Sequence, residues 1–291
     1  MSNVILVTGG AGFIGSHLIE ALVKSGERGV ISLDDYSTGS EKNHIDGARY
    51  LNGSTKDIAT LVDVTPDLVY HLGEYSRVEK SFDDIERVWD SNKNGTFAVL
   101  EFCRKHGAKL IYAGSSTKFG DGGLGRDQSP YAWTKASNTE LVCNYGNWFA
   151  LQYAITYFYN VYGPREIAEG PYATLTAIFK KRFRDSLPLQ VVSPGTQRRN
   201  FTHVDDIVSG LIAVGERGAG DNYGLGAPDA YSVLELAQMF GSSIEMLPER
   251  RGNRMSSEVD TNRARKELGW EPTRRIEDHI REYVAAHHAT V

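Results

Sequence analysis

The chain has few cysteines and lacks any long apolar stretch. Only two of its 291 residues are cysteine, Cys103 and Cys143, and neither has the spacing of a metal site. We expect both to be reduced core thiols of a cytoplasmic protein, and we expect no bound metal. No apolar run approaches the roughly 18 residues of a membrane span, which argues against a membrane partner. A strand pattern beginning at residue 3 leaves no room for a secretion signal.

An excess of basic residues is also lacking. The 32 Lys and Arg residues face 37 Asp and Glu residues, for a net charge of −5. Without a basic stripe or a charged tail, the sequence argues against a nucleic-acid partner. With 41% hydrophobic residues, the chain is long enough for one large domain or for a domain with a smaller lobe.

What the chain does have is a glycine-rich turn at its start, VTGGAGFIG at 7–15, after the apolar run 4–6. Glycines there allow a tight turn, a close approach of the backbone to phosphate, and close packing of the following helix on the strand. The start of that helix offers free N–H groups to an anion. These features predict a site for a dinucleotide pyrophosphate, made by Gly9, Gly12, Phe13, Ile14 and Gly15.

Two acidic residues follow the next expected strand. The apolar run 30–33 ends in Asp34 and Asp35, about 20 residues beyond the glycine turn. A carboxylate at this position accepts hydrogen bonds from the adenosine ribose and repels a 2′-phosphate. The predicted cofactor is therefore NAD rather than NADP.

Short apolar runs alternate with helical patterns over the first 160 residues, which predicts a parallel sheet with helices on both faces. The expected strands are 3–8, 29–33, 48–52, 67–71, 108–113 and 152–158, and the expected helices lie near 13–25, 56–63, 84–106 and 131–149. Later elements are a helix near 172–184, a strand at 189–192, and helices near 204–216 and 275–288.

The predicted fold is α/β, a Rossmann-like doubly wound parallel sheet with a smaller mixed α/β C-terminal lobe for the substrate. We assign 1–165 and about 200–222 to the dinucleotide-binding domain. The substrate lobe takes about 166–199 and 223–291.

Tyr131 and Lys135 lie four residues apart after Pro130, on one face of an expected helix. A phenol is a poor base at neutral pH, but a neighbouring ammonium group and a nicotinamide cation stabilise the phenolate. Ser115 ends the expected strand before this helix, at the sheet edge where ligands bind. These three residues are the predicted catalytic group.

Over nearly its full length the chain resembles the extended short-chain dehydrogenase/reductase family, the NAD-dependent nucleotide-sugar epimerases and dehydratases. The matching motifs are TGGxGFIGSHL at 8–18, the acidic pair, NxxGTxxxLE at 92–101, YNVYGPR at 159–165, QxR at 197–199 and LGWxP at 268–272.

The resemblance implies a nucleotide-diphosphate sugar as substrate and a homodimer formed through the helices 84–106 and 131–149. It implies further cofactor contacts from Ser37, Thr38, Asp57, Leu72, Gly73 and Lys135. It implies substrate contacts from Ser115, Ser116, Tyr131, Asn160, Arg199 and Arg250.

Glu74 departs from the family, which has small residues at 73 and 74. Its carboxylate is predicted either to contact the substrate or the nicotinamide ribose, or to pair with Arg77 or another basic residue. Tyr157 replaces the arginine usual before the YNVYGPR motif, and the sequence gives no reason for it. Tyr172 is a weaker candidate for the pocket wall.

Family members first oxidise the sugar at C4. In 4,6-dehydratases an acid and a base follow the catalytic hydroxyl residue, but Ser116 and Thr117 stand there. Neither hydroxyl is a useful acid or base near neutral pH, which disfavours dehydration. A 4-epimerase is the preferred interpretation, and a 4-oxidase that releases the keto sugar is the alternative. A non-catalytic NAD-binding regulator is disfavoured because the tyrosine and lysine are both present.

Overall fold

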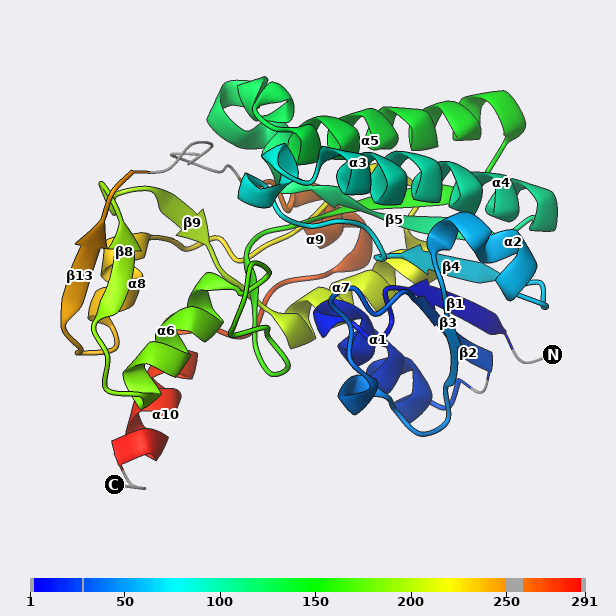
Figure 1. Cartoon of the computed structure of the whole chain (residues 1–291). Coiled ribbons are helices and arrows are strands. Elements are labelled where there is room, and N and C mark those ends of the chain that lie inside the picture. Colours follow the sequence, from blue (N-terminus) through cyan, green and yellow to red (C-terminus); the bar gives the residue numbers. More distant parts are fainter. Residues whose placement is uncertain (1–2, 28, 250–258, 289–291) are drawn as a thin grey trace.

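Seven parallel strands form the centre of the molecule (Figure 1). The computed structural model describes residues 3–27, 29–249 and 259–288. The strand order is β11-β6-β5-β4-β1-β2-β3, which confirms the predicted doubly wound sheet. Its strands are β1 (Val4–Thr8), β2 (Gly29–Asp34), β3 (Arg49–Asn52), β4 (Leu68–His71), β5 (Lys109–Ser115), β6 (Tyr153–Phe158) and β11 (Gly220–Leu225). The sequence indicated the first six, and β11 was not foreseen.

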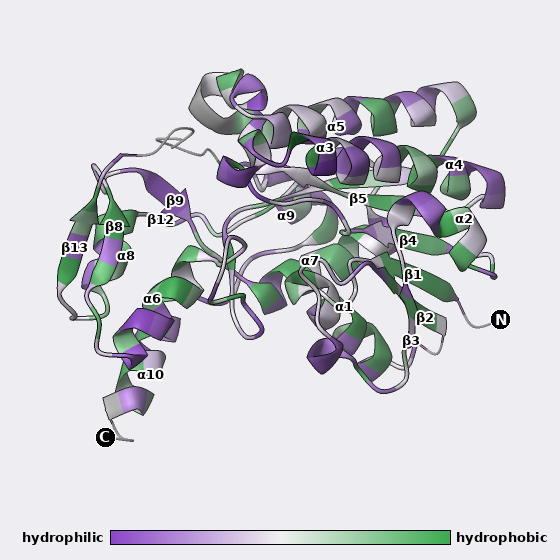
Figure 2. Cartoon of the chain, viewed as in Figure 1, coloured by the Kyte–Doolittle hydropathy of each residue, from purple (hydrophilic) through white to green (hydrophobic). Residues whose placement is uncertain are grey.

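Helices cover both faces of this sheet (Figure 1). One face carries α1 (Phe13–Lys24) and α7 (Val204–Arg217), and the other carries α2 (Ile58–Leu61), α4 (Thr96–His106) and α5 (Pro130–Phe149). Successive side chains of a strand point to opposite faces. Ile5 and Val7 of β1 therefore pack in the core beside α1 and α7, whereas Leu6 packs in the core beside α4. β1 is accordingly hydrophobic from Val4 to Val7 (Figure 2).

The helix expected over 84–106 is divided into three parts. They are α3 (Ile85–Val88), a π-helical stretch η4 (Trp89–Gly95) and α4. The wider turn directs Asn92 inward, where its Oδ1 accepts from the Tyr75 backbone N–H at 2.8 Å and its Nδ2 donates to Thr134 at 3.1 Å. Stretches of this kind are frequent at functional sites.

The remaining elements form a smaller unit beside the sheet and the connections to it. Its own core contains Phe179, Leu236, Phe240 and Ile280. The elements are β7 (Val161–Tyr162), α6 (Leu175–Arg184), β8 (Leu189–Val192), β9 (Arg198–Asn200), β10 (Thr202–His203), β12 (Ala230–Ser232), α8 (Val233–Gln238), β13 (Ile244–Leu247), α9 (Asn262–Leu268) and α10 (Ile276–His288). Of these, α9 packs against β11 and α7 of the main sheet.

The carboxyl ends of β1 and β4 meet at the point where the strand order reverses. Ligands of doubly wound sheets bind in the crevice at this switch point. The two following loops lie so close that a Cβ on Gly9, whose φ is +72°, would be 2.9 Å from the Gly73 Cα. No helix among the described residues combines the length and apolar character needed to cross a bilayer.

Candidate functional site

A cavity of about 590 Å³ opens at the carboxyl ends of the strands. Almost every residue that the sequence analysis assigned to the site lines it. Asp57 does not, and it lies exposed on η2 (Thr55–Asp57). Arg250 lies outside the described residues. The cavity is lined by Gly9, Gly12, Phe13, Ile14, Gly15, Asp34, Asp35, Ser37, Thr38, Leu72, Gly73, Glu74, Ser115, Ser116, Tyr131, Lys135, Asn160 and Arg199.

The glycine turn has the form of a dinucleotide cradle. A Cβ on Gly15 would lie 2.1 Å from the Gly9 carbonyl oxygen, so only glycine lets α1 pack this closely on the turn. Gly12 caps α1 without any side-chain hydrogen bond, which leaves N–H groups of the first turn available to a ligand. The residues present therefore fit the pyrophosphate of NAD.

Asp34 connects the glycine turn to the end of β2. Its Oδ2 accepts from the Ala11 N–H at 2.9 Å and its Oδ1 accepts from the Tyr36 N–H at 2.8 Å. Burial raises the pKa of the Asp34 carboxyl, and these N–H groups oppose that rise. Asp35 is exposed and accepts from the Ser37 N–H at 2.9 Å. Both carboxylates line the end of the cavity where an adenosine ribose would lie.

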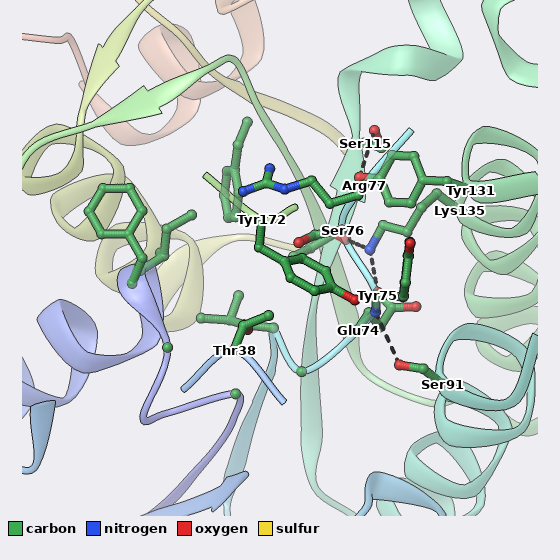
Figure 3. A pocket seen from close by; sticks show the side chains of 18 of the residues that line it. Thr38, Glu74, Tyr75, Ser76, Arg77, Ser91, Ser115, Tyr131, Lys135 and Tyr172 are labelled. Atoms are coloured by element: carbon green, nitrogen blue, oxygen red, sulfur yellow. Dashed lines mark hydrogen bonds and ion pairs between the residues drawn. The ribbon is translucent and has the colours of Figure 1, made fainter. Parts of the chain in front are cut away.

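Tyr131 and Ser115 point toward one another at the other end of the cavity (Figure 3). The Tyr131 hydroxyl donates to Ser115 Oγ at 3.3 Å, and Thr117 Oγ1 lies 2.8 Å from the same atom. Tyr131 is placed by the start of α5, where Ser129 caps the helix through the Ala132 N–H and Pro130 occupies the first turn.

Lys135, one turn along α5, forms a buried ion pair with Glu74. Its Nζ donates to Glu74 Oε2 and to the Ala113 carbonyl. The side chains of Lys135 and Glu74 are 7% and 3% exposed. This geometry matches the second of the predicted roles for Glu74, a partner for a basic residue, with Lys135 rather than Arg77 as that residue.

Three more donors converge on the other oxygen of Glu74. Its Oε1 accepts from Thr96 Oγ1 at 2.8 Å, from the Tyr112 hydroxyl at 3.1 Å and from Asn138 Nδ2 at 3.1 Å. Burial alone would raise the pKa of Glu74, but the Lys135 charge and these bonds lower it. Glu74 is therefore an ionised acceptor that protein groups surround.

A directed chain of hydrogen bonds connects this carboxylate to the glycine turn. Because Thr96 donates to Glu74, its oxygen accepts from His71 Nε2 at 3.0 Å. Burial lowers the pKa of His71 to about 4, so the ring is neutral and its Nδ1 accepts from the Thr8 hydroxyl at 2.7 Å. The Thr8 oxygen in turn accepts from the Gly73 N–H at 3.0 Å.

Sequence reasoning did not assign roles to Thr96, Tyr112 or Asn138. Thr96 belongs to the motif at 92–101, so a signal was present, but its purpose depends on an acidic residue 22 positions away. Tyr112 and Asn138 had no signal beyond their elements. Only the packing of α4, β5 and α5 around β4 brings these three side chains to Glu74.

The structure shows the surroundings of Tyr172 and Tyr157, two residues whose roles the sequence left open. Tyr172 lines the cavity, as expected, and its ring lies edge-on to Tyr75 with the centroids 5.9 Å apart. Tyr157 does not line it. The Tyr157 side chain is buried beneath Gly114, and its hydroxyl donates to Asp221 at 2.6 Å. Burial and the Asp221 charge raise the pKa of Tyr157. Tyr157 is therefore a residue of the protein core and does not form part of the cavity wall.

Asn160 and Arg199 lie on the side of the cavity nearer the smaller unit. Asn160 has a φ of +33° and donates through Nδ2 to the Asn200 carbonyl at 2.9 Å. Arg199, on β9, donates to the Arg198 carbonyl at 2.8 Å. Within the described ranges, no group of three or more His, Cys, Asp or Glu side chains is arranged to hold a metal ion.

The chain is similar in sequence to sugar-nucleotide enzymes of known activity. The chain is 30% identical to UDP-glucose 4-epimerase of Mycolicibacterium smegmatis, across 92% of this chain and 93% of that protein. It is 27% identical to UDP-glucuronic acid decarboxylase 1 of Arabidopsis thaliana, across 92% of this chain and 66% of the plant protein.

Among solved structures, UDP-glucose 4-epimerase of Thermotoga maritima with UDP-glucose superposes with a TM-score of 0.89 at 28% identity, covering 98% of this chain and 99% of that one. The model of the NAD dependent epimerase/dehydratase family matches residues 5–226. The chain thus belongs to the NAD dependent epimerase/dehydratase family and is an NAD-dependent enzyme of the extended short-chain dehydrogenase/reductase type.

Proposed function

We propose that this chain is an NAD-dependent 4-epimerase of a UDP-sugar. The observation that carries the proposal is the bond from the Tyr131 hydroxyl to Ser115, inside the cavity that begins at the glycine turn. The relatives and neighbours named above carry UDP-sugars in their names, which favours UDP over GDP.

In the proposed mechanism, Tyr131 removes the proton of the sugar C4 hydroxyl. Ser115 donates a hydrogen bond to the same oxygen and continues to do so as the oxygen becomes a carbonyl. Lys135 supplies positive charge on the same helix, which favours the phenolate form of the base. Bound NAD supplies reversible hydride acceptance at its nicotinamide ring.

The surroundings of the predicted base argue against dehydration. Ser116 and Thr117 occupy the positions where a dehydratase carries its acid and base, and hydroxyls cannot replace carboxylates there. The feature that favoured a 4-oxidase was Glu74, as a contact of the substrate or of the nicotinamide ribose. Four protein donors bind that carboxylate, so we favour the epimerase.

The proposal is tested by incubating the full chain with a panel of UDP-sugars and following products and nicotinamide absorbance together. We expect a mixture of two C4 epimers without net reduction of the nicotinamide. Reduced cofactor accumulating with a released keto sugar would instead identify an oxidase.

Replacement of Tyr131 by Phe removes only the hydroxyl. We expect Tyr131→Phe to reduce turnover at least about 1,000-fold while bound NAD is retained. The matched control is Tyr145→Phe on the same helix, whose hydroxyl donates to Glu101 away from the cavity. Activity retained in Tyr131→Phe would exclude this residue as the base.

We also propose a homodimer formed through the outer surface of α3, η4, α4 and α5. Large apolar side chains are exposed there, and Trp89 stacks on Trp133 with the ring centroids 5.7 Å apart. A patch of this kind marks an interaction surface. Its members include Trp89, Phe97, Trp133, Trp148 and Phe149.

A further inference from the structure

Arg77 extends into the cavity from the loop between β4 and η3 (Glu79–Phe82). Figure 3 shows its guanidinium reaching into the open space between Tyr131 and Tyr172. The guanidinium carbon lies 5.9 Å from the centre of the Tyr172 ring, and that of Arg87, on α3, lies 5.7 Å from it. Two cations from separate elements therefore meet at one aromatic wall of the pocket.

Neither cation has a carboxylate partner among the described residues. The buried Arg77 Nε has no hydrogen-bond partner, and no carboxylate of the described residues forms an ion pair with Arg77 or Arg87. The groups that interact electrostatically with Arg77 are the phenols of Tyr131, Tyr172 and Tyr75. Burial of an unpaired charge is unfavourable, so such a residue is normally completed by an anionic partner.

The other cation of this region already has a carboxylate partner. Lys135 forms an ion pair with Glu74, whereas Arg77 has no such partner among the described residues. The carboxylates of Asp34 and Asp35 belong to the opposite end of the cavity, where they bond to the backbone of the glycine turn and the loop after β2. Of the other carboxylates that line the cavity, Asp90 pairs with Lys56 and Glu79 lies exposed on η3. Arg77 therefore remains a cation without an ion-pair partner among the described residues.

The position of Arg77 points to the sugar rather than to the diphosphate. Under the proposed function Tyr131 acts at C4, and the diphosphate is attached to C1 on the far side of the pyranose ring. C6, by contrast, is attached to C5, the neighbour of C4. An anion close to both Tyr131 and Arg77 is thus a C6 carboxylate, which the planar guanidinium can bind through two parallel hydrogen bonds.

We propose that the substrate is a UDP-hexuronic acid whose C6 carboxylate is bound by Arg77, with Arg87 adding positive charge at the entrance. The inference rests on the proposed C4 chemistry and adds the class of sugar. Tyr172 holds the two guanidinium groups in place through its ring face. Arg77 is then the residue that separates acidic from neutral sugars.

The test compares kcat/KM for UDP-glucuronic acid and UDP-glucose with the full chain and NAD. We expect the wild type to prefer the acid by about 100-fold, as for loss of a charged hydrogen-bonded pair. Arg77→Met, which keeps the length of the side chain without its charge, should lower that ratio by about 100-fold. Arg104→Met is the matched control, because Arg104 pairs with Glu101 on the surface of α4.

An equal loss of kcat/KM for both sugars in Arg77→Met would place Arg77 on the diphosphate and overturn the proposal. A wild type that prefers UDP-glucose would overturn it as well. Titration calorimetry measures binding of the sugar nucleotide independently of turnover. Tighter binding of UDP-glucuronic acid that disappears in Arg77→Met supports the carboxylate site even if no epimer forms.

The identity of the product distinguishes the proposed carboxylate site from the proposed epimerase activity. Oxidation of a hexuronic acid at C4 yields a β-keto acid, which can lose its carboxyl group as CO₂. Formation of a UDP-pentose would support the carboxylate site at Arg77 and contradict the epimerase. Formation of the C4 epimer with the carboxylate intact would support both.

Discussion

Glu74 and Lys135 form an ion pair that is almost completely withdrawn from solvent, with side chains 3% and 7% exposed. A buried pair of this kind is not by itself a source of stability, because desolvation offsets the attraction. Here the pair fixes a cation that the proposed mechanism requires. A series of hydrogen bonds through Glu74, Thr96, His71 and Thr8 also connects Lys135 to the glycine turn.

Glu74→Gln removes a negative charge beside Lys135 while keeping the shape of the side chain. Loss of a negative charge favours proton loss from neighbouring groups. We therefore expect the pH profile of kcat/KM to move to lower pH by about one unit. The matched control is Glu101→Gln, whose carboxylate pairs with Arg104 outside the cavity. An unshifted profile with lower activity would show that Glu74 serves packing alone.

Asp34→Asn tests the ribose assignment more cleanly than a change to alanine, because the amide oxygen can still accept one backbone N–H. We expect NAD affinity to fall about 10-fold and the preference over NADP to narrow, since the carboxylate no longer repels a 2′-phosphate. Fluorescence titration of both cofactors measures this. Asp35→Asn, at an exposed position, is the comparison, and an unchanged cofactor preference in Asp34→Asn would contradict the role.

His71 should make the fold sensitive to acid. Burial lowers its pKa from 6.5 to about 4, so between these values the unfolded chain binds a proton that the folded chain does not. The free energy of unfolding should therefore fall as pH falls from 6.5 to 4, by on the order of 3 kcal/mol from this group.

Urea unfolding at several pH values measures this dependence. His71→Gln should flatten the slope, whereas His106→Gln, at an exposed histidine, should not. An identical slope in wild type and His71→Gln would contradict the assignment.

Trp133→Glu should disrupt the proposed dimer. The side chain is 39% exposed and stacks on Trp89, and burying a carboxylate in an apolar interface is strongly unfavourable. Light scattering should report a dimeric mass for the wild type and a monomeric mass for the variant. Leu124→Glu, at an exposed apolar residue on η5 (Ser116–Asp127), is the control. A monomeric wild type would refute the proposal.

The sequence alone predicted the sheet, the glycine turn and the group around Tyr131, because these depend on local signals. Glycines, apolar periodicity and helix caps act within a few residues of where they stand. The strand β11 was missed because the short segment Gly220–Leu225 is polar at its start and becomes a strand only by pairing with β6. The π-helical stretch at Trp89–Gly95 likewise reflects contacts that Asn92 makes across the fold.

Only the tertiary structure decided what Glu74 does and which cation it neutralises. Its donors come from α4, β5 and α5, so the sequence could show that the residue is unusual but could not choose among its partners. The sequence could not predict the role of Arg77 for the same reason, because whether a charge has a partner depends on every element packed around it. Local sequence signals predicted the cofactor and the base, and the convergence of distant elements decided which charges surround Lys135 and Arg77.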